Sequence, residues 1–363
     1  MTKRSLLIDF HKRNGATFTE QNGWLLALHF GDPIREYRSV RTAAGLFDLS
    51  HRVLLQFTGP DRVSFLQGML SNDLRALNTF DGQQAMILNQ QGKVLADVRV
   101  LCAMNSFYLD FWEPLKEKIV VHLNRYLVAD EVEINDPSAN WKMLSMQGPR
   151  AQELLAQVFG HVELPSRPAQ HTMVQFDDSP ICVVRADHSG QSGYDLVVEK
   201  SLLAAFAQRL TQLGAFWVGE EAQKTLRIEA GIPRYGVDFT EDNLLLEVGL
   251  DDAVSFTKGC YLGQEVVERI RSRGHVNKKL CGLLLDGDEP ANFGDPISAA
   301  ADKEVGRITS SVVSLALNRP IALGYVSKDC WSVGTNLSVQ RENGPITATV
   351  TALPFVTPSP ASS

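Results

Sequence analysis

Residues 53–70 read VLLQFTGPDRVSFLQGML, and residues 141–159 read WKMLSMQGPRAQELLAQVF. Each stretch is a short apolar strand, then Gly-Pro, then a segment whose apolar side chains recur at helical spacing. A proline just inside a helix start supplies a preset φ at a position where its missing N–H is not needed. The shared order therefore predicts two related units, each beginning with a strand and a helix.

The segments that follow each helix also correspond. Strand-like stretches at 86–103 and 107–112 lead to a predicted helix at 114–127, and stretches at 173–199 lead to one at 201–214. A period of about 90 residues is too long for a solenoid and fits two α+β halves of split βαβ type. A chance likeness between two common units is the alternative, but the matching Gly-Pro offset favours a duplication.

After the two halves the pattern changes. A helical pattern at 219–230 ends before Gly231, and from about residue 279 short β-type runs are separated by Gly, Pro, Asn and Asp. Such runs are typical of a small antiparallel barrel or sandwich. We therefore expect an α+β protein. Residues 1–278 should form two related halves, at roughly 41–136 and 137–218, and a joining segment at 219–278, followed by a C-terminal β-barrel at 279–356 and a disordered tail at 357–363.

Composition narrows the class of protein. The 363 residues are 44% apolar and 21% charged, as in ordinary globular proteins, and the net charge is −7. An acidic chain argues against direct nucleic-acid or anionic-membrane binding; the basic stretch at 269–279 is explained by a solvated helix end unless it lines a cleft. No signal peptide or membrane-length apolar run is present. Five scattered cysteines show no metal spacing, which predicts a cytoplasmic protein without a metal site.

One short motif suggests chemistry. Residues 258–265 read KGCYLGQE and precede a helix-like stretch. A helix N-terminus favours an anion, and Lys258 adds a positive charge two residues from Cys260, so both effects favour a thiolate. The alternative is an inert buried thiol, the commoner state of cysteine. These residues alone leave both interpretations open.

Three further positions carry weaker signals. Asp97 stands in an otherwise apolar strand, where it either faces solvent or points into a pocket. Arg227 on a predicted helix either clamps a carboxylate or lies on a solvated face. Gly190 and Gly193 around Gln191 allow close approach of a flat ligand or form a plain hairpin loop. Because the usual seryl, zinc and nucleotide motifs are absent from the sequence, those chemistries have no support.

Taken together, several stretches resemble the glycine-cleavage T-protein (aminomethyltransferase) superfamily over nearly the whole chain. The matching stretches are 41–51, 59–73, 226–239, 244–270, 305–314 and 321–326. Within the superfamily, the pattern K-G-C-[FY]-x-G-Q-E resembles the YgfZ-type folate-binding branch, since T-proteins lack the cysteine.

The resemblance implies a ring of three domains around a central channel that binds tetrahydrofolate. It also implies that the chain is a tetrahydrofolate-binding accessory protein for assembly or repair of iron–sulfur proteins, including tRNA-thiolating enzymes. Folate and iron–sulfur client proteins are then the partners, and Cys260 with Lys258 supplies the reactive thiol. The alternative is a folate-dependent aminomethyltransferase or demethylase acting on a small amine, with Asp97 as the acid/base. A third interpretation is a scaffold that only binds its ligand.

The resemblance also assigns folate-binding residues. Gln191 stands where T-proteins carry a glutamate that holds the pterin, and a neutral amide can hydrogen-bond but cannot balance charge. Residues 92–97, GKVLAD, keep only one of two acids, Asp97, and Gln84 replaces an expected tyrosine. These departures argue against the T-protein reaction, which needs a positioned acid or base. The predicted folate-binding residues are Asn72, Asp97, Gln191, Tyr194 and Arg227.

Overall fold

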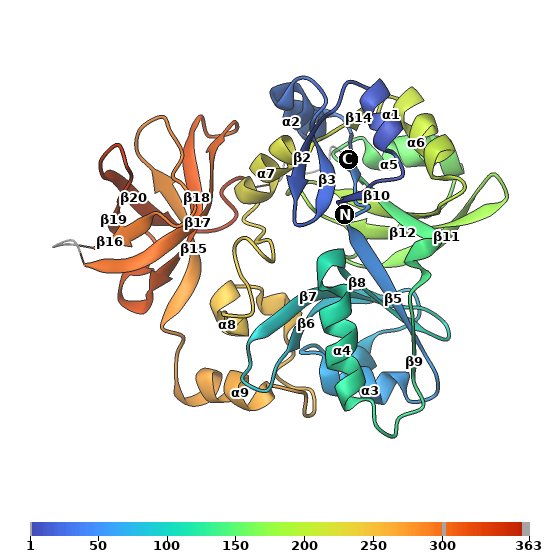
Figure 1. The fold of residues 1–363 in the computed structure, drawn as a ribbon, viewed down its shortest axis with the longest axis horizontal. Coiled ribbons are helices and arrows are strands. Elements are labelled where there is room, and N and C mark those ends of the chain that lie inside the picture. The colour runs from blue at the N-terminus through green and yellow to red at the C-terminus, as the bar shows by residue number, and fades with distance from the viewer. Residues whose placement is uncertain (1, 300–302, 358–363) are drawn as a thin grey trace.

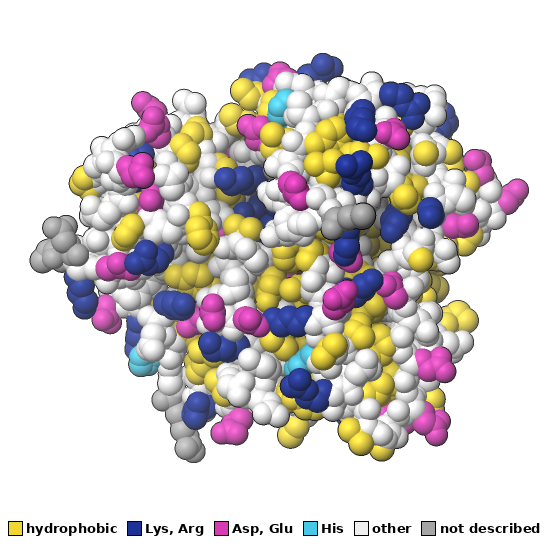
Figure 2. Space-filling view, viewed as in Figure 1, with side chains coloured by type: hydrophobic (Ala, Val, Ile, Leu, Met, Phe, Trp, Pro, Cys, Tyr) yellow, Lys and Arg dark blue, Asp and Glu magenta, His cyan; other side chains and the backbone are white. Residues whose placement is uncertain are grey.

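The structure, a computed structural model, describes residues 2–299 and 303–357. Three lobes surround a common centre: a five-stranded sheet with its helices, a six-stranded sheet with its helices, and a closed barrel (Figure 1). All but the first residue of the predicted disordered tail, 357–363, lies outside the described residues. On the face drawn in Figure 2, basic and acidic side chains are interspersed, and apolar side chains show between the lobes.

The first half carries the first Gly-Pro unit. Its strands follow the order β6-β7-β8-β5-β9, and its two helices bury their apolar side chains against one face of the sheet. The elements are β5 (Arg52–Thr58), α3 (Arg62–Met69), β6 (Gly82–Leu88), β7 (Val94–Cys102), β8 (Phe107–Trp112), α4 (Lys116–Tyr126) and β9 (Glu133–Asn135).

The second half repeats this plan. Its strand order, β11-β12-β13-β10-β4-β14, is that of the first half with β4 added before the last strand. The elements are β4 (Gly45–Asp48), β10 (Trp141–Gln147), α5 (Ala151–Phe159), β11 (His171–Phe176), β12 (Ser179–Ala186), β13 (Gly193–Glu199), α6 (Leu203–Gln212) and β14 (Phe216–Trp217). The addition of β4 was not predicted, because it precedes both Gly-Pro units in the sequence.

The two sheets face each other without helices between them. Their apolar contact is a small cluster of Leu101 from β7, Ala169, and Val184 from β12. The backbones approach closely here, since a Cβ at Gly82 would lie 2.5 Å from the carbonyl oxygen of Ala169. The layers are therefore helix, sheet, sheet, helix, and polar side chains in the middle must find partners across the interface.

The N-terminal segment, for which the sequence predicted no elements, covers the junction of the lobes. It forms a small sheet in the order β1-β3-β2, and the hairpin β2–β3 lies beside the helix α7 (Glu220–Glu229) (Figure 1). The elements are β1 (Lys3–Arg4), α1 (Ile8–Arg13), β2 (Thr17–Gln21), β3 (Trp24–His29) and α2 (Pro33–Thr42). Asp32 caps α2 by accepting from two backbone N–H groups, and Pro33 occupies its first turn.

The joining segment and the barrel complete the chain. The joining helices are α7 (Glu220–Glu229), α8 (Leu245–Val248) and α9 (Gln264–Arg273). The closed barrel has the order β15-β18-β17-β16-β19-β20, with strands β15 (Lys278–Leu285), β16 (Pro296–Ser298), β17 (Glu304–Ser314), β18 (Arg319–Ser327), β19 (Asn336–Val339) and β20 (Ile346–Thr351). The predicted fold class, two related split-βαβ-like halves and a small antiparallel barrel, is confirmed.

The lengths and compositions of the helices bear on membrane insertion. Within residues 2–299 and 303–357, none is both long enough and apolar enough to cross a bilayer.

Replacing Gly82 by alanine tests the contact between the sheets. The new methyl group would lie 2.5 Å from the carbonyl oxygens of Ala169 and Val100, so we expect the variant to lose about 1–3 kcal/mol of unfolding free energy by overpacking. Urea denaturation measures this loss. Gly68→Ala is the matched control: its methyl group meets open space on helix α3, and we expect no loss, or a gain of up to about 1 kcal/mol. Equal behaviour of the two variants contradicts the tight sheet-to-sheet contact.

Candidate functional site: a cavity between the lobes

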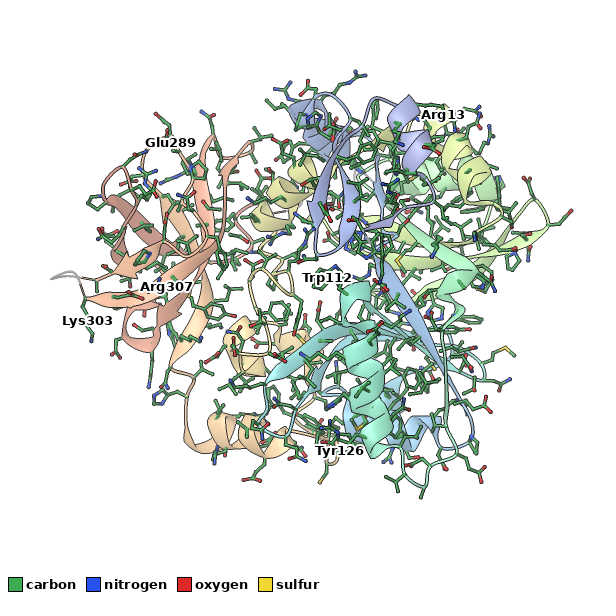
Figure 3. The ribbon with its side chains drawn as sticks, in the orientation of Figure 1. Arg13, Trp112, Tyr126, Glu289, Lys303 and Arg307 are labelled. Carbon is green, nitrogen blue, oxygen red and sulfur yellow. The ribbon has the colours of Figure 1, made fainter. Side chains whose placement is uncertain are left out.

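A cavity of about 590 Å³ lies where the two halves, α7 and the N-terminal hairpin meet. Its walls come from β6 and β7, the end of β12 with the loop after it, the segment 232–237 after α7, and the hairpin β2–β3. Trp112 at the end of β8 also lines it, and Figure 3 places this ring between the lobes. The volume falls within the range of about 300–1,000 Å³ typical of small-molecule sites.

Arg99 of β7 joins the two halves at the cavity wall. Its Nη2 lies 2.5 Å from Asp110 in the first half and 2.6 Å from Asp195 in the second. Burial alone would lower the pKa of Arg99, but the two carboxylates outweigh it and raise that pKa. The guanidinium of Arg99 therefore stays charged. A buried charge without a counter-charge is costly, so the network needs the carboxylates of both Asp110 and Asp195.

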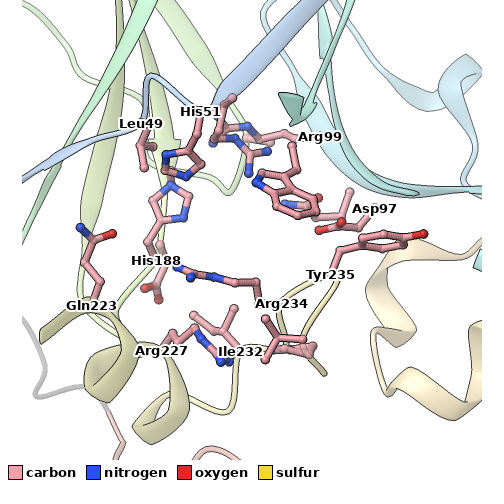
Figure 4. Close-up of a pocket in the computed structure, with 18 of the residues that line it drawn as sticks. Leu49, His51, Asp97, Arg99, His188, Gln223, Arg227, Ile232, Arg234 and Tyr235 are labelled. Atoms are coloured by element: carbon pink, nitrogen blue, oxygen red, sulfur yellow. Dashed lines mark hydrogen bonds between the residues drawn. The ribbon is translucent and has the colours of Figure 1, made fainter. Parts of the chain in front are cut away.

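Each carboxylate of this network has a second partner. Arg52 Nε donates to Asp110 at 2.7 Å, and His188 Nε2 lies 2.9 Å from Asp195 Oδ1. Burial alone would raise the pKa of Asp195, but His188 and Arg99 hold it well below its usual range. Among the described residues, the other ring nitrogen of His188 has no hydrogen-bond partner, and His188 lines the cavity (Figure 4).

Asp97 lies two residues from Arg99 on the same face of β7 and has a different environment. Its carboxylate lines the cavity, and within the part of the chain that the structure describes no other side chain bonds it. Burial raises the pKa of Asp97, and the charge of Arg52 and a hydrogen bond from the residue's own backbone N–H oppose this rise. Burial also raises the pKa of the neighbouring Tyr235 to about 12, and Asp97 adds to that shift. Figure 4 shows these two side chains on one wall.

Several buried nitrogen atoms around the cavity lack a partner within the described ranges. They are Nδ1 of His51, Nε2 of Gln83, Nε of Arg99 and Nε of Arg227. Burial lowers the pKa of His51 to about 4, so its imidazole is neutral near pH 7 and both donates and accepts. A pterin ring is flat and presents donors and acceptors along its edges. The unpaired atoms and the carboxylate of Asp97 therefore fit such a ligand.

Arg227 lines the cavity but is largely committed to structure. Its Nη1 donates to Asp238 Oδ2 at 2.7 Å and to the Ile232 carbonyl oxygen at 3.1 Å, while Nη2 donates to Ser310 Oγ at 2.8 Å. These bonds fasten α7 to the loop after it and to barrel strand β17. Nε and one N–H of Nη2 are left for a ligand among the described residues, so a clamp on a carboxylate by Nη1 and Nη2 together would require existing bonds to break.

The other predicted folate-binding residues lie outside the cavity lining. Asn72 Nδ2 donates to the carbonyl oxygens of Gln84 and Asp252, at 2.8 and 2.9 Å. Tyr194 belongs to the apolar core of the second half, and Gln191 is buried in the loop before β13. The structure thus brings Asp97 and Arg227 together at the cavity and separates them from these three, whose folate contacts stay predictions.

The KGCYLGQE motif also lies outside the cavity lining. Cys260 is exposed and lies three residues before Gly263, the N-cap of α9. Lys258 points inward, and its ammonium donates to the carbonyl oxygens of Gln67, Leu70 and Asn72 at 2.7–2.8 Å. All three N–H groups are thereby used, and burial lowers the pKa of Lys258 to about 8.

Two other motif residues have packing roles. Tyr261 is buried in the first core. Gly263 has φ +84°, and a Cβ there would lie 2.5 Å from the Asn89 carbonyl oxygen, so the turn before α9 needs a glycine to approach the β6–β7 hairpin. The expectation that Lys258 activates Cys260 has no contact to support it, and the reactivity of the thiol stays a prediction.

Several site residues were not singled out from the sequence. Arg99, Asp110 and Asp195 are charged residues in otherwise apolar strands, the same signal that singled out Asp97. The pattern marks each as unusual but does not say which residue is its partner. His51 gave no signal, because a lone histidine after a strand is common.

Comparison with known protein families agrees with this architecture. The model of the GCVT N-terminal domain matches residues 7–258, and that of the glycine cleavage T-protein C-terminal barrel domain matches residues 278–357. The chain therefore belongs to the glycine cleavage T-protein family.

Individual relatives cover almost the whole chain. The aminomethyltransferase of Rubrobacter xylanophilus is 30% identical over 355 residues, 97% of this chain and 94% of that protein. That of Thermosynechococcus vestitus is 29% identical, over 97% of this chain and 95% of the relative. The crystal structure of glycine cleavage system aminomethyltransferase T from Bartonella henselae superposes with a TM-score of 0.91 at 25% identity, covering 99% of both chains.

These relatives correct the main functional prediction. Eight of them, each matched over at least 94% of this chain, are named aminomethyltransferase. The prediction of an accessory protein for iron–sulfur proteins and tRNA-thiolating enzymes is wrong on this comparison, and iron–sulfur client proteins have no support as partners. Aminomethyltransferases of this family use tetrahydrofolate, so the predicted cofactor is confirmed at the level of the family.

Replacing Lys258 by methionine tests its structural role. The substitution keeps most of the side-chain volume but leaves three carbonyl oxygens at the end of α3 without their donor. We expect a loss of about 2–4 kcal/mol in unfolding free energy, because unsatisfied buried acceptors are costly. Urea denaturation of Lys258→Met measures it, and exposed Lys200→Met should change stability by less than about 0.5 kcal/mol. Undiminished stability of Lys258→Met contradicts this role.

Asp97→Asn tests the raised pKa of the cavity carboxyl. A carboxyl whose pKa is higher in the folded than in the unfolded chain destabilises the fold once it ionises, fully so above the folded pKa. We therefore expect the variant to be more stable than wild type at pH 7, and the gain to shrink as pH falls through the raised pKa. Urea midpoints across this range measure it, with exposed Asp288→Asn as control. Destabilisation at pH 7 would show that Asp97 has a partner after all.

Proposed function

We propose that this chain is a tetrahydrofolate-dependent transferase that removes a one-carbon unit, as an aminomethyl or N-methyl group, from a small amine. The observation that carries the proposal is the carboxyl of Asp97, held without a partner among the described residues on the wall of a cavity of suitable size. Relatives named aminomethyltransferase over the length of the chain support it. Tetrahydrofolate would supply the nitrogen atoms that accept the one-carbon unit.

Asp97 would move the proton in this reaction. Transfer from an amine requires a proton at the departing nitrogen and the loss of one from the accepting nitrogen, which calls for a group whose pKa is raised toward the working pH. Burial raises the pKa of Asp97, as such a role requires. Because Ala96 replaces the neighbouring acid of the T-protein pattern, Asp97 has no second carboxyl on that side.

His188 would be the second proton carrier. Its Nε2 is oriented by the buried carboxylate of Asp195, and the residue lines the cavity. A carboxylate that fixes the tautomer and orientation of a histidine is a common arrangement for proton transfer. Two groups on different walls would let one give a proton while the other receives one.

Two finer predictions remain part of the proposal. The pattern K-G-C-Y-L-G-Q-E supports placement in the YgfZ-type branch of the family, in which Cys260 carries the branch's functional thiol. The five scattered cysteines, without a paired or metal-binding spacing, support a cytoplasmic location. The placement in this branch and the cytoplasmic location are both independent of whether the protein catalyses the transferase reaction.

A turnover assay tests the proposed reaction. Purified protein is incubated anaerobically with tetrahydrofolate and either an aminomethyl thioether or an N-methyl amine, and one-carbon adducts of the folate are measured by mass spectrometry. We expect turnover that falls by about 100-fold or more in Asp97→Asn, since general acid–base catalysis contributes that much. His188→Phe should reduce turnover less than Asp97→Asn does. Because the substitution removes the imidazole, it should also change the pH profile of turnover.

Cys260→Ser is the control in the same assay, because the thiol lies outside the cavity lining. We expect it to turn over at the wild-type rate. Folate binding without turnover on either donor would reject the transferase and favour a binding-only protein. Loss of turnover in Cys260→Ser with full activity in Asp97→Asn would move the reaction to the thiol.

A further inference from the structure

The residue before Gly-Pro differs between the two Gly-Pro units. It is Thr58 in the first unit and Gln147 in the second. Thr58 ends β5, and its hydroxyl donates to the exposed Glu133 at 3.4 Å. Gln147 ends β10 and is fully buried. Because a buried amide needs hydrogen-bond partners, the same position must do something different in the two halves.

The side-chain amide of Gln147 uses its full hydrogen-bonding capacity. Its Nε2 donates to Ser145 Oγ at 2.9 Å and to the Ala186 carbonyl oxygen at 3.3 Å. Its Oε1 accepts from the His188 backbone N–H at 3.1 Å and from Ser189 Oγ at 3.3 Å. Three of these four partners lie at the end of β12 and in the loop after it. One amide therefore holds the loop that carries His188.

The partners also fix which end of the Gln147 amide is the oxygen. The Ala186 carbonyl group can only accept a hydrogen bond, and the His188 backbone N–H can only donate one. The reverse orientation of the amide would place two acceptors together at Ala186 and two donors together at His188. Neither a carboxylate nor an apolar side chain can therefore make the same set of bonds.

Gly193 leaves room for this side chain. It pairs with Gln147 across β10 and β13, and a Cβ at Gly193 would lie 2.2 Å from Gln147 Nε2. A larger residue at this position would displace the amide from the loop. The glycine is thus explained by the close approach of a side chain from the neighbouring strand.

Two groups fix His188, one at its backbone and one at its ring. Gln147 accepts from the backbone N–H, and Asp195 lies 2.9–3.0 Å from ring Nε2. The two groups belong to the same strand pair, in which Ser145 pairs with Asp195 and Gln147 with Gly193. With both its backbone and its ring held, the imidazole has a defined place on the cavity wall (Figure 4).

We propose that Gln147 is a positioning residue of the site: it acts through His188, by fixing the backbone that carries the imidazole so that Asp195 can orient Nε2. The proposal rests on the proposed function, in which His188 is the second proton carrier. It goes further by giving the second Gly-Pro unit a part in the site that the first unit does not have.

Nitrogen-15 NMR of the histidine rings tests this contact without turnover. His188→Phe identifies the His188 signals among those of the eight histidines. In wild type, at a pH where the ring is neutral, we expect one tautomer with its proton on Nε2, because Asp195 accepts from that atom. Gln147→Met should mix the two tautomers. Gln147→Glu keeps the volume and the acceptor for the His188 N–H, so it should preserve more of the wild-type signal.

A double-mutant cycle tests whether Gln147 acts through His188. In the turnover assay, Gln147→Met should lower kcat by about tenfold, since a misplaced proton carrier loses efficiency, and should change the pH profile as His188→Phe does. In the His188→Phe background the same substitution should lower kcat no further, because residues that act as a unit are not additive. Thr58→Val is the matched control from the first Gly-Pro unit, and it should leave kcat and the His188 signals at their wild-type values.

The outcomes separate the two proposals. Unchanged His188 signals in Gln147→Met, or an equal loss of kcat with and without the imidazole, overturn the positioning role while the transferase stands. If Gln147→Met does not fold, Gln147→Glu replaces it in the cycle, with a smaller loss that must likewise vanish in the His188→Phe background. If wild type shows no turnover, the proposed function fails, and the ring signals still decide whether Gln147 holds His188.

Discussion

The two β-sheets of this protein meet across a buried ion-pair network centred on Arg99. Because neither sheet has a helix on its inner face, polar side chains there must find partners in the opposite sheet, and Arg99 does so with Asp110 on its own side and Asp195 on the other. Removing one member would leave a buried charge unpaired at a cost of about 3–5 kcal/mol. The network thereby fixes the distance between the halves and the shape of the cavity wall.

The same strand places Asp97 beside this network without including it. Paired charges, such as those of Arg99 and Asp195, hold the walls together, whereas the carboxyl of Asp97 and several buried nitrogen atoms around the cavity have no side-chain partner among the described residues. If every polar group on the wall had a partner within the protein, few groups would remain to bind a polar ligand. The groups without a partner are therefore the ones that we expect to bind the ligand.

The sequence predicted the parts of the fold that depend on local pattern. The two Gly-Pro units identified the halves, and the change to short β runs identified the barrel, whereas the N-terminal hairpin and β4 carry no such signal. For the site, one charged residue in an apolar strand, Asp97, was recognised, but Arg99 and Asp195 were not, because their pairing joins residues almost one hundred positions apart. The motif around Cys260 suggested chemistry, yet Lys258 within it holds the end of a helix. An octapeptide can be distinctive for structural reasons, and here it led to a wrong function.

Hydrogen–deuterium exchange with and without tetrahydrofolate tests the central claim, that the ligand occupies the cavity between the lobes. Exchange of backbone amides reports which segments open less often when a ligand is bound. The account predicts protection in peptides covering 82–102, 185–195 and 227–237, with no change at 255–265. Protection confined to the segment around Cys260, or no protection at saturating tetrahydrofolate, would contradict it.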